Sequence, residues 1–301
     1  MDYKKIFKNR EFRLKLISCL RFIPTKPYLK MVYKIKTGKK LNLKNPIGFN
    51  EKLNWLKVND IHPEYTDLVD KIKVREYVQN KIGEDICFPL LGQWEKYEDV
   101  NFEILPEQFV MKCNHDSGSV KIINNKSKID HKELAKFFKS RLKINSYTIG
   151  REYPYKNIKP MIMAEKYMVP NGSSDINDYK FFCFNGKPEI MFIATDRSTD
   201  VKFDFFDMNF NHLDIENIHP QAGKRIEKPK LFEEMKEIAS KLSQGMKFVR
   251  IDLYEIEGKV YFGEFTFFHG GGFWLFKPDE WERKLGDWIE IDNCKTKRDK
   301  R

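Results

Sequence analysis

The sequence predicts an α+β fold with a mainly antiparallel sheet. Two pairs of apolar runs, each interrupted by two residues that favour a tight turn, indicate two β-hairpins. The first joins Tyr179–Phe184 to Glu189–Thr195 through Asn185-Gly186, and the second joins Phe248–Ile256 to Val260–Phe267 through Glu257-Gly258. Helical stretches lie before, between and after the hairpins, which is typical of the α+β class.

The length and composition indicate a folded protein. The chain of 301 residues can form one large domain or two to three subdomains with a buried core. Hydrophobic content of 41% and aromatic content of 14% exclude a disordered polymer. We expect no transmembrane helix, because no run of about 18 apolar residues is present. We also expect no signal peptide, because the first residues contain no uninterrupted apolar core.

The cysteines and the charge bear on location and partners. Five scattered cysteines without paired spacing predict reduced thiols, a cytoplasmic location and no zinc site. The net charge of +11 suits nucleic acid, an anionic membrane or a phosphorylated substrate, although a generally basic composition also explains it. No helix-turn-helix, zinc-finger or RNA-binding signature is present, so nucleic acid is not expected as a partner.

The N-terminal 65 residues are expected to be helical. Apolar residues recur among basic ones in residues 1–40, and a helix over Tyr28–Ile35 should end at Gly38. Such a segment could lie on the inner face of an anionic membrane, but packing on its own domain is the favoured interpretation. Asn50 could cap a short helix that continues through Trp55 and Val58.

A lysine and a glycine-containing loop follow in the next segment. Thr66–Lys81 is predicted as a helix that carries Asp70-Lys71 near its start and stops at Gly83, followed by a short strand at Ile86–Leu90. Gln108–Cys113 should form a strand, and the loop 114–119 leads into a second strand, Val120–Ile123. Lysine ammonium groups and loop N–H groups both attract anions, so this arrangement could cover phosphates.

The remaining elements follow from similar local signals. Asp130 and Glu133 form a plausible capping box for a helix to Leu142, and Pro229 suits the first turn of a later helix. The other predicted elements are a β-segment at Met161–Met168, a strand at Val201–Phe206, a helix at Pro229–Leu242 and a final helix at Asp279–Ile291.

The terminal hairpin carries charges that a purely structural hairpin would not need. Arg250 and Asp252 share a face because strand side chains alternate, and Glu264 reaches that face if the register pairs the two acids. Two neighbouring carboxylates favour a cation between them, and Mg²⁺ accepts one or two such ligands together with phosphates. The alternative is that these charges form the solvated face of the sheet.

Four stretches of the chain carry a resemblance to a known family. They are F-N-E-K-L-N-W-L (49–56), V-M-K-C-N-H-D-S-G (110–118), D-Y-K-F-F-C-F-N-G-K-P (178–188) and the terminal hairpin. Read in order, these stretches resemble the TupA-like ATP-grasp proteins of bacterial surface-polysaccharide gene clusters. The similarity covers roughly residues 45–290. It implies an ATP-grasp fold, in which two α+β subdomains with mainly antiparallel sheets clasp ATP. The expected divisions are a helical region (1–65), a lid part with the phosphate loop (66–165), a part with the metal site (166–292) and a basic tail (293–301).

The resemblance also implies roles for individual residues. Contacts to ATP are implied for Lys71 and Lys112 on the phosphates, for Ser117, Gly118 and Ser119 in the covering loop, and for Glu165, Lys166 and Met168 at the adenine and ribose. Lys180, Arg197 and Arg250 would face phosphate or the acyl substrate. Asp252, Glu264 and Thr266 would hold Mg²⁺, with Thr266 standing where the superfamily usually has Asn.

The activity implied by the resemblance is ATP-dependent ligation of a carboxylate and an amine through an acyl phosphate. The expected substrates are a uronic-acid carboxylate of a surface polysaccharide, or of its lipid-linked precursor, and an amino acid or other amine. His115 and His269 are candidate general bases for that amine, although loop histidines more often serve in hydrogen bonding. A glycosyltransferase that uses a nucleotide sugar and a basic membrane-associated scaffold are the alternatives.

Overall fold

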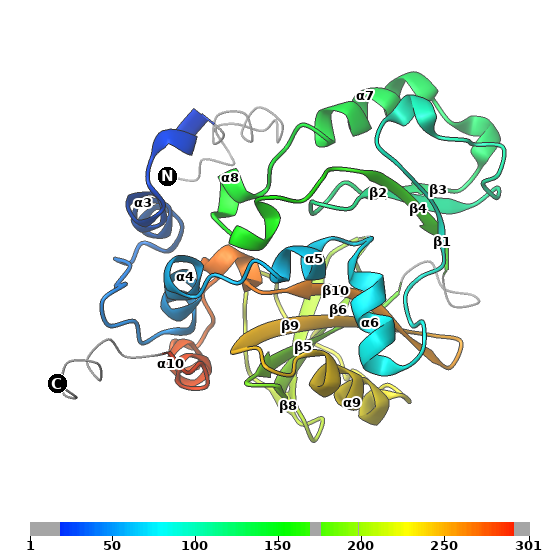
Figure 1. Ribbon diagram of the computed structural model, residues 1–301. Coiled ribbons are helices and arrows are strands. Elements are labelled where there is room, and N and C mark those ends of the chain that lie inside the picture. The colour runs from blue at the N-terminus through cyan, green and yellow to red at the C-terminus, as the bar shows by residue number, and fades with distance from the viewer. Residues whose placement is uncertain (1–18, 169–175, 198, 292–301) are drawn as a thin grey trace.

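The computed structural model describes residues 19–168, 176–197 and 199–291, and their strands form two antiparallel sheets. Figure 1 shows the smaller sheet with helix α7 over it, and the larger sheet with α9 against it. The predicted helical segment at residues 1–18 and the basic tail 293–301 lie outside the described residues. None of the described helices has the length and apolar character needed to cross a membrane.

The smaller sheet has the strand order β1-β4-β2-β3. Its strands are β1 (Leu90–Trp94), β2 (Phe109–Cys113), β3 (Lys121–Ile123) and β4 (Ile162–Lys166). Helix α7 (His131–Arg141) covers this sheet. Of the predicted capping box the structure shows the Asp130 half, because the Asp130 carboxylate accepts hydrogen bonds from the amides of Lys132 and Glu133. Phe109, Met111 and Phe138 are fully buried in the core between the sheet and the helix.

The larger sheet has the order β10-β9-β5-β6-β7-β8. Its strands are β5 (Asp178–Phe184), β6 (Lys187–Thr195), β7 (Lys202–Asp207), β8 (His212–Leu213), β9 (Phe248–Ile256) and β10 (Lys259–Thr266). Both predicted hairpins are present. Their turn residues have positive φ, at Asn185 (49°) with Gly186 (79°) and at Glu257 (50°) with Gly258 (73°), as two-residue hairpin turns require.

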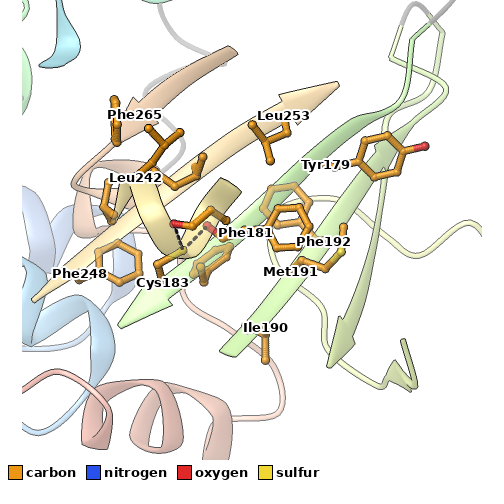
Figure 2. Packing of buried hydrophobic residues seen from close by; sticks show 14 of the residues in the cluster. Tyr179, Phe181, Cys183, Ile190, Met191, Phe192, Leu242, Phe248, Leu253 and Phe265 are labelled. Carbon is orange, nitrogen blue, oxygen red and sulfur yellow. Dashed lines mark hydrogen bonds between the residues drawn. The ribbon is translucent and has the colours of Figure 1, made fainter. Parts of the chain in front are cut away.

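Helix α9 (Phe232–Leu242) packs its apolar face on the larger sheet. Figure 2 shows Leu242 of this helix gathered with Phe181, Phe192 and Phe248 of the strands in one core. Phe181 and Leu242 are fully buried. Burying a side chain of this size contributes about 1.5–3 kcal/mol, so this core fixes the sheet that carries the terminal hairpin.

The N-terminal helices attach to the larger sheet, except for the first α-helix, which packs on the second in a separate cluster with Phe273. They are α3 (Thr25–Thr37), α4 (Phe49–Asn59), α5 (Tyr65–Val69) and α6 (Val74–Ile82), joined in space by α10 (Glu280–Asp287) from the C-terminal end. Helix α3 ends at Gly38 with φ of 72°, as predicted. Helix α10 meets the start of α4 so closely that a Cβ at Gly286 would lie 2.2 Å from the backbone oxygen of Ile47. Residues 65–88 also pack in the core of the larger sheet.

Several local predictions were wrong, including the start of α9, which begins at Phe232 and leaves Pro229 outside its first turn. The helix expected at Thr66–Lys81 is broken at Asp70, because its carboxylate accepts a hydrogen bond from the Ile72 amide and starts a new turn. The strand expected at Ile86–Leu90 begins only at Leu90, since Cys87 makes a single parallel bridge to Phe262. Asn50 does not cap α4 but lies inside it, where its buried amide donates to Glu282.

Candidate functional site

A cavity of about 590 Å³ lies between the two sheets. Its smaller-sheet wall comes from β2, β4 and the loop 114–119, and its larger-sheet wall comes from β5, β9, β10 and Arg197. Polar and apolar side chains both line it. The apolar ones include Phe88, Val110, Val120, Ile122, Met168 and Ile176. A mixed lining of this kind suits a ligand with one apolar end and one charged end.

The smaller-sheet wall carries an ion pair. Lys112 of β2 and Glu165 of β4 lie on neighbouring strands, and the Lys112 Nζ is 2.6 Å from the Glu165 Oε2. Both side chains line the cavity and are largely buried. The backbone N–H of Lys166 donates to the Pro89 carbonyl. This N–H is therefore used in holding β4 to the segment that leads into β1. Met168, at the exit of β4, also lines the cavity.

The loop 114–119 is held from both sides. Lys71, in the break between α5 and α6, donates to the Asp116 carbonyl at 2.8 Å. Arg141 of α7 pairs with the Asp116 carboxylate and donates to the Ser117 carbonyl at 2.9 Å. Gly118 has φ of 81°, and the Ser119 hydroxyl accepts the Cys113 N–H, so the hydroxyl supports the loop. Lys71, Ser117, Gly118 and Ser119 all line the cavity.

The larger-sheet wall carries a chain of alternating charges. Lys180 of β5 lies 2.6 Å from the Asp178 carboxylate and also pairs with Asp252 of β9, its register partner. Arg197 approaches Asp178 at 3.5 Å. The second Asp178 oxygen is buried with no hydrogen-bond partner among the described residues. Burial raises the pKa of Asp178 despite the opposing charge of Lys180.

The terminal hairpin has the register that the charge pattern predicts. Asp252 is opposite Glu264, and Arg250 is opposite Thr266. The Arg250 Nη2 lies 2.7 Å from the Asp252 Oδ2, 3.0 Å from the Thr266 Oγ1 and 3.6 Å from the Glu264 Oε1. Burial would raise the pKa of Asp252, but the charges of Arg250 and Lys180 outweigh burial and lower it.

The expected metal ligands therefore converge on one cationic nitrogen. Three hard oxygen donors around one point suit Mg²⁺, which usually takes one or two carboxylates and completes its shell with phosphate and water. A metal ion there would replace the Arg250 guanidinium. Of these three residues only Glu264 lines the cavity. Within the described ranges no group of three or more His, Cys, Asp or Glu side chains could hold a metal ion, so phosphate oxygens would have to complete the shell.

Lys71 connects the two walls. Its Nζ donates to the phosphate-loop carbonyl of Asp116 and lies 3.9 Å from the Glu264 Oε2 on the opposite sheet. The break at Asp70 is what places Lys71 between the sheets, because a continuous helix would carry its side chain along the helix surface. Lys71 thus meets a carbonyl from one wall and a carboxylate from the other.

The two candidate histidines are buried. The His269 Nδ1 lies 2.9 Å from the Arg250 Nη1, and its Nε2 lies 3.2 Å from the Asn217 Oδ1, which makes Nδ1 the acceptor and Nε2 the donor. Burial and the charges of Arg250 and Lys180 lower the pKa of His269 well below its usual value. Burial also lowers the pKa of His115. Neither histidine lines the cavity, so their role as general bases stays a prediction.

A family model described as TupA-like ATPgrasp matches residues 51–290. The chain belongs to the TupA-like ATP-grasp family. The resemblance seen in the sequence is thereby confirmed, and so is the ATP-grasp fold with its two antiparallel sheets. In this TupA-like protein the eight residues expected to contact ATP all line the cavity, together with Lys180 and Arg197.

Solved structures matched to this chain include ligases of low sequence identity. D-alanine–D-alanine ligase from Bacillus anthracis complexed with ATP has 17% identity and a TM-score of 0.41 over 78% of this chain and 67% of that chain. Another structure of that ligase from the same organism has 17% identity and a TM-score of 0.43 over 85% of this chain and 78% of that chain. Phosphoribosylamine–glycine ligase from Thermotoga maritima has 16% identity and a TM-score of 0.38 over 67% of this chain and 48% of that chain. No curated protein matches this chain.

Other cavity residues of the TupA-like protein were not among the expected site residues. They include Asp116, whose partner Arg141 is 25 residues away, and Asp178, which shares a strand face with Lys180. The alternation of side chains along β5 is a signal that could have identified Asp178. No local pattern identifies Arg141, because its contact with Asp116 depends on how α7 packs over the sheet.

Proposed function

We propose that this TupA-like protein is an ATP-dependent carboxylate–amine ligase that works through an acyl phosphate. The single observation that carries the proposal is the cavity of the family fold, whose walls bring together Lys71, Lys112, Lys180 and Arg197. ATP activates a carboxylate because phosphate is a far better leaving group than oxide. Phosphoryl transfer needs little besides positioning and neutralisation of oxygen charges, which these cations can provide.

The two ends of the cavity suggest how ATP would lie. Val110, Ile122 and Met168 would contact the base, with the Glu165 carboxylate at the ribose or adenine. Lys71, Lys112, Lys180 and Arg197 would contact the phosphates under the loop 117–119. Asp252, Glu264 and Thr266 would hold Mg²⁺, which would supply positive charge to the phosphate end of the site. Arg250 would then leave the centre of this group and face the γ-phosphate.

For the substrates we propose a uronic-acid carboxylate and an amino acid or other amine. The product would be an amide on a cell-surface polysaccharide, or on a lipid-linked precursor. This choice rests on the resemblance to proteins of polysaccharide gene clusters. The basic net charge of +11 is compatible with an anionic acceptor of this kind.

Nucleotide preference separates this proposal from a glycosyltransferase. The purified chain is incubated with Mg²⁺ and either ATP or a panel of nucleotide sugars, and release of nucleoside diphosphate is measured with and without uronic acids and amino acids. We expect ADP release from ATP, stimulated when a carboxylate and an amine are both present. Release of nucleoside diphosphate from nucleotide sugars alone would overturn the proposal.

Replacement of Lys112 by alanine is expected to weaken ATP binding about tenfold or more while the fold is retained. The Lys112 ammonium lines the cavity, and a charge-assisted hydrogen bond to phosphate contributes about 1.5–3 kcal/mol. Titration calorimetry with ATP and circular dichroism measure the two effects. Lys159, which pairs with exposed Glu95, offers a control in Lys159→Ala. An unfolded Lys112→Ala variant would instead indicate a structural role for the pair with Glu165.

A further inference from the structure

A buried lysine and a carboxylate meet near the metal and Arg250 end of the site. Lys57 of α4 is fully buried, and its Nζ donates to the carbonyls of Gly150 at 2.8 Å and Gly271 at 2.7 Å. The Glu152 Oε1 lies 4.0 Å from this nitrogen. That separation gives an ion pair but exceeds hydrogen-bond distance.

Glycines leave room for the Glu152 carboxylate. A Cβ at Gly150 would lie 2.4 Å from the Glu152 Oε1, and a Cβ at Gly271 would lie 3.5 Å from it. Gly271 also has φ of 65°, a conformation that larger residues rarely adopt. The H-G-G-G stretch therefore forms a turn, and it also leaves space for the Glu152 carboxylate beside that turn.

The carboxylate is not saturated. Its side chain is only 18% exposed, yet it accepts no hydrogen bond from the residues that the structure describes. Carboxylates with so little solvent contact normally have hydrogen-bond donors. Lys57 supplies charge, but its short hydrogen bonds go to the two carbonyls. Glu152 can therefore accept a donor from a ligand without losing a partner in the protein.

The position of Glu152 relates it to the reacting end of the site. Gly271 belongs to the 3₁₀ turn His269–Gly272 that follows β10, and His269 of this turn contacts Arg250. Glu152 does not line the cavity assigned to ATP.

We propose that Glu152 forms the subsite for the substrate amine, binding its ammonium group and accepting a proton from it. This inference rests on the proposed ligase function. Glu152 is an anion whose partner Lys57 lies beyond hydrogen-bond distance, and the cationic substrate of the proposed reaction is the amine. Burial raises the pKa of Glu152 against the opposing charge of Lys57, which favours proton uptake.

The proton balance of the step is complete. One ammonium proton passes to a Glu152 oxygen, which frees the nitrogen lone pair. This pair forms the C–N bond to the acyl carbon while the bond from that carbon to the phosphate oxygen breaks, and its electrons leave with the phosphate. A second proton on nitrogen goes to the departing phosphate, and the amide keeps the third.

Binding of free amino acids tests the subsite without knowledge of the sugar. Thermal unfolding of the full chain is followed with each of the twenty proteinogenic amino acids, and with the N-acetyl form of any that stabilises it. We expect at least one free amino acid to raise Tm and its N-acetyl form to have no effect. In Glu152→Gln the apparent Kd should increase about tenfold or more, because a charged hydrogen-bond acceptor becomes neutral.

Three controls make the result decisive. Glu95→Gln, on an exposed carboxylate, should bind the amino acid like the wild type. Glu152→Asp keeps the charge and serves if the glutamine variant does not fold, with weakened but measurable binding expected. Equal binding in wild type and Glu152→Gln, or no stabilisation by any free amino acid, overturns the inference. Failure of the ligase proposal would look different, since amine binding would persist without ADP release.

Discussion

Asp252→Asn is expected to destabilise the fold by about 3–5 kcal/mol, the range found when one partner of a buried ion pair is removed. Asp252 is only 1% exposed and accepts hydrogen bonds from the Arg250 Nε at 2.6 Å and Nη2 at 2.7 Å. Lys180 donates to the same carboxylate. Without the Asp252 charge, the Arg250 guanidinium stays buried beside Lys180 with much less compensation.

Equilibrium unfolding in urea, followed by circular dichroism, measures this loss. The matched control is Asp279→Asn, because Asp279 is 75% exposed and pairs with Lys39 at the surface. Surface pairs of this kind contribute about 0–1 kcal/mol. A loss below 1 kcal/mol for Asp252→Asn would contradict the expectation and would mean that the charges of this group are well solvated.

The parts of the fold that the sequence predicts are those encoded within a few residues. Asn185-Gly186 and Glu257-Gly258 each place a glycine at the second turn position, which needs positive φ, so both hairpins follow. Their registers do not follow from the turns alone, because each hairpin contains a β-bulge. The Asp130 cap of α7 is equally local. The pairing of Asp252 with Glu264 needs a further feature, because the turn alone would set Glu264 opposite Ile251. A β-bulge at Gly263 shifts the register by one residue and brings the two acids opposite each other.

The parts that the sequence does not predict depend on contacts between distant segments. Periodicity favoured one helix across residues 66–81, but the Asp70 carboxylate competes for backbone amides and breaks it. The Arg141 contact with the phosphate loop requires α7 to be in place first. Glu152 gave no signal at all, because its surroundings come from Lys57 and Gly271, which are far away in the chain.

These two classes of contact have different consequences for the site. Local signals build the hairpins, whereas long-range contacts pair the strands of each wall and join the two walls. Lys71 approaches both Asp116 and Glu264, and Lys57 donates to both Gly150 and Gly271. A ligand in the cavity would replace or strengthen the contacts of Lys71. The hydrogen bonds of Lys57 to Gly150 and Gly271 would remain as the connection near Arg250.

Glu264 differs from Asp252 in a way that allows chemistry to be separated from stability. Its side chain is 38% exposed, lines the cavity, and has cations only at 3.6 Å (Arg250) and 3.9 Å (Lys71). Glu264→Gln should therefore change the free energy of unfolding by less than about 1 kcal/mol.

The same Glu264→Gln variant should lower the rate of ADP release about a hundredfold or more, and it should raise the Mg²⁺ concentration needed for half-maximal activity. A metal ion contributes several kcal/mol of charge stabilisation in such reactions, and each 1.4 kcal/mol lost is a factor of ten. ADP release is measured against Mg²⁺ concentration, with Glu257→Gln in the exposed turn of the same hairpin as control. An unchanged Mg²⁺ dependence in Glu264→Gln would exclude this carboxylate as a metal ligand, because a lost ligand must be compensated by a higher metal concentration.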